Sequence, residues 1–214
     1  MRSATAEIES PRQRILEAAL ELLAEHGYEG TSLQQVADLV GLHKSSLFHH
    51  FRSKEELARE VHRGLAERLL ARLEPLLAEE PPRFESLLGA LEASADHFAA
   101  EPASARLLMR LLVTTRQTEG GLRDPFVAAP GEVDAIDRVL ALVGAWLARA
   151  RAAGVIRYVP VRHTVLNLMG LVLLYPAVFH HVPAAALRGD PRAPEVLASR
   201  KRELRAFLEG ALAP

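Results

Sequence analysis

The chain has 214 residues, of which 49% are hydrophobic and 25% charged, with a formal net charge of −1. This length and apolar content suffice for one large domain or two modest ones, and the abundance of Leu, Ala, Glu and Arg favours helices. The lack of cysteine excludes disulfides, thiolate metal sites and a cysteine nucleophile, and fits the cytoplasm, where we expect the protein to reside.

The first ten residues contain no apolar run, so we expect no signal peptide. The most apolar stretch, Val165 to Phe179, is shorter than the ~20 residues that cross a bilayer. Asn167 and Pro176 also interrupt it. We therefore expect a buried helix in this stretch and no membrane partner.

From Pro11 to His26 the apolar residues repeat at helical spacing, and Gly27 is a suitable helix stop. Thr31 and Gln34 have the spacing of a capping box, which predicts the start of a second helix. Gly41 ends that second helix, because glycine adopts the left-handed backbone that a sharp turn requires.

A third, short helix is expected from about Lys44 to Phe51, with Leu47, Phe48 and Phe51 on its inner side. Helices as short as the second and third are unstable alone, so both must pack on the first. Three helices with a tight turn before the last describe a helix-turn-helix, whose final helix enters the major groove of DNA.

Helical periodicity continues through the rest of the chain, with no convincing strand. The sequence therefore predicts an all-α fold, with an N-terminal arm and helix-turn-helix domain at 1–54 and a larger helical domain at 55–214. The further helices are expected to follow Ser53 and then to span about 84–100, 103–115, 133–153, 160–181 and 195–212.

The helix-turn-helix segment carries a local positive charge within a chain that is slightly acidic overall. Between residues 31 and 54 the cations are Lys44, Arg52 and Lys54, and the anion is Asp38, which gives a net +2. Hydrogen-bonding side chains on the outer side of the third helix would face DNA. They are Ser45, Ser46, His49 and His50.

The stretch from Ile15 to Leu57, roughly a fifth of the chain, resembles the DNA-binding domain of TetR-type (TetR/AcrR) regulators. The remainder resembles that family only in its helical layout. The residues that carry the resemblance are Gly27, Thr31, Val36, Ala37, Gly41, Lys44, Leu47, Phe48, Phe51 and Ser53 to Leu57.

The resemblance implies contacts to phosphate at a helix N-terminus, to base edges and to the DNA backbone. Phe48 belongs to this site but replaces the usual tyrosine, which removes one phosphate contact, and His43 replaces the usual Ser or Thr cap. The residues implied for the three kinds of contact are, in order, Thr31 and Ser32; Lys44, Ser45, Ser46 and His49; and His50 and Lys54.

The helix expected at 160–181 is more apolar than a one-sided surface helix, so it should pack on its own domain and on a partner. With the last helix it could form a four-helix interface of a homodimer, as the resemblance also implies. A two-fold dimer requires a near-palindromic operator. The expected interface residues are Leu171, Leu174, Val178, Leu197, Leu204 and Leu208.

The middle helices are expected to enclose a pocket for a small, mainly apolar effector. The resemblance implies that such an effector releases a repressor from DNA. Each candidate lining residue could equally belong to ordinary core. The candidates are His97, Phe98, Met109, Phe126, Trp146, Asn167 and Tyr175.

Two other functions stay open: a DNA-binding dimer without an effector, and a helical enzyme with an incidental helix-turn-helix. A cavity above ~300 Å³ would favour an effector, and a solid core would favour the first alternative. The sequence lacks nucleotide-binding, hydrolase and metalloprotease motifs, so we expect no enzyme, catalytic residue or cofactor. His49 and His50 point about 100° apart on a helix, so we expect no metal site.

Overall fold

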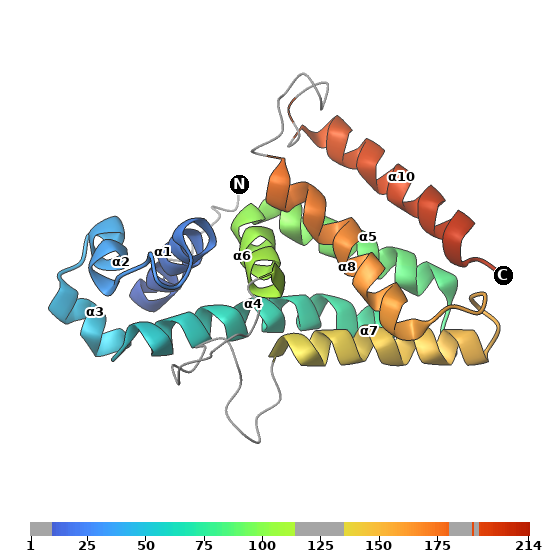
Figure 1. Ribbon diagram of the computed structural model, residues 1–214, viewed down its shortest axis with the longest axis horizontal. Helices are drawn as coiled ribbons and strands as arrows, with labels where there is room; N and C mark the ends of the chain where they lie inside the picture. Colours follow the sequence, from blue (N-terminus) through green and yellow to red (C-terminus); the bar gives the residue numbers. More distant parts are fainter. Residues whose placement is uncertain (1–9, 114–134, 180–189, 191–192) are drawn as a thin grey trace, which may run out of the picture.

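The computed structural model describes residues 10–113, 135–179, 190 and 193–214, and within these ranges it consists of helices without strands (Figure 1). The expected all-α architecture is therefore confirmed. The helices are α1 (Pro11–His26), α2 (Leu33–Val40), α3 (Lys44–His50), α4 (Lys54–Leu77), α5 (Phe84–Ala100), α6 (Pro102–Val113), α7 (Ala135–Ala152), α8 (Val161–Val178) and α10 (Pro194–Leu212).

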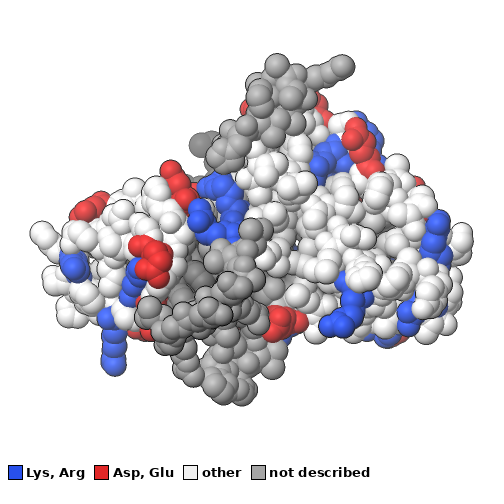
Figure 2. Space-filling model, viewed as in Figure 1, with Lys and Arg blue, Asp and Glu red and all other residues white. Residues whose placement is uncertain are grey.

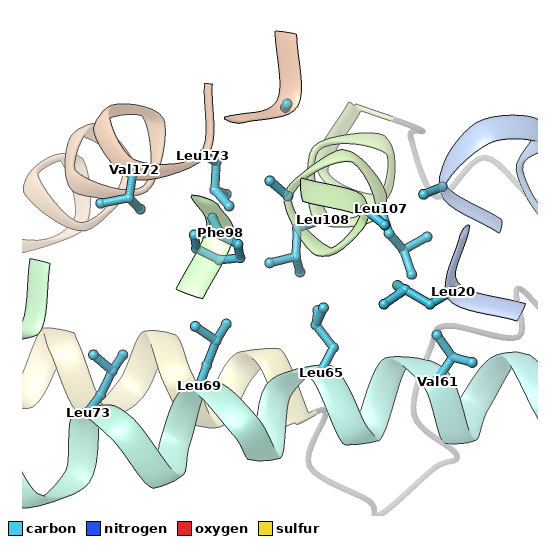
Figure 3. Packing of buried hydrophobic residues seen from close by; sticks show 14 of the residues in the cluster. Leu20, Val61, Leu65, Leu69, Leu73, Phe98, Leu107, Leu108, Val172 and Leu173 are labelled. Atoms are coloured by element: carbon cyan, nitrogen blue, oxygen red, sulfur yellow. The ribbon is translucent and has the colours of Figure 1, made fainter. Parts of the chain in front are cut away.

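Helix α4 runs beneath the whole molecule and packs in both of its parts (Figure 1). Its buried leucine and valine residues recur every three or four positions, which places them on one side of the helix. Figure 3 shows Val61 facing Leu20 of α1 and Leu69 facing Phe98 of α5. The same stripe therefore enters the core of both parts, and the domain boundary after residue 54 stays a prediction.

Helices α1, α2 and α3 pack around a small core in which Ile15, Val36, Leu47 and Phe51 are fully buried. Between α2 and α3 the chain turns at Gly41, whose φ of 70° is left-handed. Two short helices and this turn form the predicted helix-turn-helix.

The capping box that begins α2 is not the expected pair of Thr31 and Gln34. Ser32 is the cap: its hydroxyl accepts from the Gln35 amide at 3.2 Å, and its own amide donates to the Gln35 side chain at 2.7 Å. Thr31 is buried, and its hydroxyl donates to the Gly27 carbonyl at 2.8 Å. Both pairs have the same sequence spacing, and the burial of Thr31 decides between them.

Helix α6 makes a second connection between the two parts by holding the end of α1. The Arg106 guanidinium lies 2.9 Å from the Glu21 carboxylate, and Arg110 donates to the Glu25 carbonyl at 2.9 Å. An ideal Cβ placed on Gly27, which follows α1, would lie 3.0 Å from Arg110. These contacts join residues 85 positions apart.

A buried polar cluster lies where α4, α5 and α6 meet. Glu101 lies 3.0 Å from the Arg68 guanidinium and accepts a hydrogen bond from the Ser104 hydroxyl. His97 Nε2 lies 4.0 Å from Glu101 and has no hydrogen-bond partner. Burial is the main cause that lowers the pKa of His97 from 6.5 to about 4, with Glu101 opposing it and Arg72 and Arg68 adding to it.

We expect His97 to make stability depend on pH. Between pH 6.5 and about 4 the unfolded chain binds a proton that the folded chain does not, so stability falls as the pH is lowered through this range. The full shift corresponds to roughly 3 kcal/mol. Urea unfolding at several pH values should show a flatter profile for His97→Gln, while the exposed His43→Gln keeps the wild-type slope. Equal slopes in all three proteins would contradict the prediction.

Gly41→Ala should destabilise the protein through its backbone alone. An added Cβ would meet no atom within 4 Å, so the cost is that of the left-handed conformation, about 1 kcal/mol. Gly64→Ala is the matched control, because Gly64 lies inside α4 with ordinary space for a Cβ and should gain about 0.5–1 kcal/mol. Denaturant midpoints of the two variants should shift in opposite directions; a neutral Gly41→Ala would disprove the argument.

Candidate functional site

Helix α3 lies at the end of the molecule remote from α10 and presents polar side chains outward (Figure 1). Leu47 and Phe51 anchor its inner side in the core. The exposed residues of its outer side are Lys44, Ser45, Phe48, His49 and His50, with Ser46 partly buried. The structure therefore brings most of the expected DNA-contacting residues together on one surface.

The expectation that Phe48 faces the core with Leu47 and Phe51 is wrong. The Phe48 side chain is 41% exposed, and the Lys44 Nζ lies 5.9 Å from the centre of its ring. One residue corresponds to a 100° rotation on a helix, so Phe48 follows Leu47 out of the core. Its spacing of four residues from the exposed Lys44 was the signal that could have indicated this.

Two residues expected to contact DNA make contacts within the chain instead. The Thr31 hydroxyl is buried on Gly27, so Thr31 does not lie on the exposed surface. Lys54 Nζ donates to the Tyr28 carbonyl at 2.9 Å and lies 4.1 Å from the centre of the Tyr28 ring. Both side chains hold the segment between α1 and α2, and thereby help to place α2 and its cap, Ser32.

The helices around α3 are fixed by contacts that the sequence pattern did not indicate. Arg14 of α1 donates to the Val40 carbonyl at 2.7 Å, which satisfies a free carbonyl at the end of α2. Arg12 lies 5.0 Å from the centre of the Phe51 ring and 2.6 Å from Glu60 of α4. His43, which precedes α3, makes no capping hydrogen bond through its side chain.

The positive charge of this site is local. Lys44 and Arg52 are exposed, and Asp38 accepts a hydrogen bond from Gln34 at 2.7 Å. In the view of Figure 2, acidic and basic side chains are scattered over both parts of the molecule, without a large surface of one sign. Any attraction for a polyanion therefore arises from a few side chains near α3.

The larger helical part contains an apolar cavity of about 80 Å³ between α4, α5, α7 and α8. Phe98 lines it, as do leucine and valine side chains from each of these helices. Its polar lining residue is Ser94, whose hydroxyl donates to the Ala90 carbonyl at 2.8 Å. The volume is well below the ~300 Å³ typical of a site for a small molecule.

The other residues expected around an effector do not line this cavity. Met109, Asn167 and Tyr175 line a separate groove between α8 and α10, with a volume of about 1000 Å³. His97 and Trp146 are buried and line neither space, and the indole Nε1 of Trp146 has no hydrogen-bond partner. Phe126 lies outside the described residues.

The expected dimer residues divide into two groups. Leu204 and Leu208 are buried within their own chain, where they attach α10, so the structure does not support their place on a free surface. Leu197 is partly buried beside a smaller cavity, and the α8 residues line the groove: Leu171, Leu174 and Val178. The exposed large apolar residues of α8 and α10 are Leu166 at 60%, Leu174 at 53% and Phe207 at 58%.

Within the described ranges, α8 is also the helix that is long and apolar enough to cross a membrane, judged by length and composition. A third of its Val161–Val178 span is buried in the chain. The expectation of a wholly buried helix is thus wrong for the single chain, because one side of α8 is free.

Comparison with known proteins gives a family match at the N-terminal part. A family model described as bacterial regulatory proteins, tetR family, matches residues 15–61. Over 88 residues the chain is 36% identical to the HTH-type transcriptional repressor KstR2 of Mycobacterium tuberculosis, which covers 41% of this chain and 44% of that repressor. The chain thus matches less than half the length of this curated relative.

Solved structures extend the likeness of fold beyond this segment. The ketosteroid transcriptional regulator KstR2 of Mycobacterium tuberculosis has a TM-score of 0.71 over 97% of both chains, at 21% sequence identity. The TetR family transcriptional regulator PfmR from Thermus thermophilus has a TM-score of 0.63 at 29% identity, covering 79% of this chain and 86% of PfmR. The helix-turn-helix, its family match and the shared fold together show that this chain belongs to the tetR family of bacterial regulatory proteins.

Proposed function

We propose that this protein is a homodimeric, sequence-specific DNA-binding regulator of the bacterial cytoplasm, a repressor that a small apolar effector releases from its operator. The observation that carries the proposal is the polar outer side of α3, held on a rigid three-helix core. A helix presented in this way fits the major groove. We propose no catalytic role.

The side chains on α3 suit recognition of base edges and phosphates. Ser45 and His49 lie on the side opposite Leu47 and offer donors and acceptors to base edges. Lys44 and Arg52 supply cations for phosphate or guanine. Ser32, exposed at the start of α2, is placed to contact a phosphate.

The dimer is supported by the exposed apolar side chains of α8 and α10. Leu166, Leu174 and Phe207 border the groove between these helices, and water contact with three large apolar side chains is unfavourable. A second copy that packs α8 and α10 against them would place two α3 helices about one DNA turn apart, ~34 Å. The operator would then be near-palindromic.

The effector is supported by the apolar cavity beside α4. An effector that fills it would have to be apolar, because Ser94 is already hydrogen-bonded. A ligand larger than the present 80 Å³ would have to displace the surrounding helices, and α4 carries such a displacement to the helix-turn-helix. The same small volume favours the alternative of a DNA-binding dimer without an effector.

Selection of bound sequences from a random DNA pool tests the DNA-binding proposal. We expect an enriched near-palindrome, with weaker binding by Lys44→Ala and a salt dependence reduced by about one unit of slope per lost phosphate contact. Arg202→Ala is the charge-matched control, because Arg202 is exposed on α10 and should leave both quantities unchanged. If no sequence is enriched, the proposal fails.

Leu174→Glu tests the dimer. Leu174 is 53% exposed in the single chain, so a glutamate there can fold but would bury a charge in the proposed interface. Sedimentation at micromolar concentration should show a monomer for this variant and a dimer for the wild type. Leu39→Glu, an equivalent change on the exposed side of α2, should remain dimeric. A dimeric Leu174→Glu protein would exclude this face.

A further inference from the structure

The ring of Phe48 is an apolar group on the surface that faces DNA. Phe48 is exposed on α3, while its neighbour Leu47 is fully buried and fixes the helix behind it. The amino group of Lys44 lies 5.9 Å from the centre of the ring, so the ring stands beside a cation on the same side of the helix. This side chain is thus held where a base or a phosphate would approach.

The chemistry of this ring limits what it can recognise. Phenylalanine has no hydrogen-bond donor or acceptor, so it cannot bond to phosphate oxygens or to the polar atoms of base edges. In the major groove the apolar group on a base edge is the C5-methyl of thymine. Contact with that methyl would also remove the exposed ring from water.

We propose that Phe48 reads the C5-methyl of one thymine in each half-site and is therefore a determinant of operator specificity. This inference rests on the DNA-binding function proposed above. Lys44, one helical turn before Phe48, then contacts a phosphate or guanine beside that thymine.

Uracil substitution in the selected operator tests this directly, because deoxyuridine keeps the base pairing of thymidine and lacks only the methyl group. Each thymine is replaced in turn, and full-length wild-type protein is titrated at fixed salt. We expect one symmetric position at which replacement weakens binding about four-fold in one half-site and about fifteen-fold in both, the effect of one buried methyl group per half-site.

The Phe48 variants assign the effect to this side chain. Phe48→Ala should bind the thymine and uracil operators equally, and more weakly than the wild type binds thymine. Phe48→Tyr keeps the ring and should keep the discrimination, and Leu39→Ala, another exposed apolar residue of this domain, should keep it as well. Circular dichroism checks that each variant is folded.

Several results would overturn the inference while the DNA-binding function stands. These are an operator without thymine in its half-sites, no position sensitive to uracil, or sensitivity that Phe48→Ala retains. A uniform loss for Phe48→Ala on both operators would assign the ring to the sugar backbone instead. If the pool yields no operator at all, the proposed function itself fails.

Discussion

The continuous apolar stripe of α4 is the constraint on which the remaining structure depends. The part near Val61 packs under α1, and the part near Leu69 packs under α5 (Figure 3). Because interiors are close-packed, neither end of this helix can move without repacking the core around it. The orientation of α3 is therefore tied to the packing of the larger helical part. The contacts of Arg106 and Arg110 with the end of α1 provide a second tie.

Much of the helical layout could be predicted from the sequence, because local signals mark the helix ends. Pro11 begins α1, Gly27 and Gly41 end helices α1 and α2, and Ser53 caps α4. These residues act through their own backbone geometry or one nearby amide, so a single sequence contains the information. The same reasoning located the helix-turn-helix and the polar outer side of α3.

The errors arose where two choices share the same local pattern. Thr31 and Ser32 are both followed three residues later by glutamine, and the contact of Thr31 with Gly27 selects Ser32 as the cap. Leu204 and Leu208 have the spacing of an apolar helix side, but spacing does not say whether that side meets its own chain or a partner. Such choices are decided by tertiary contacts.

The effector site was the least predictable part, since polarity in a helical core does not identify a cavity. Trp146 was expected to line a pocket because its indole nitrogen needs a partner, yet it is fully buried without one. As the single tryptophan of the chain, it lies in α7, in the larger helical part. Intrinsic tryptophan fluorescence therefore reports only on that part, whereas circular dichroism reports on every helix. The two signals separate melting of the helix-turn-helix from loss of the larger core without any added label.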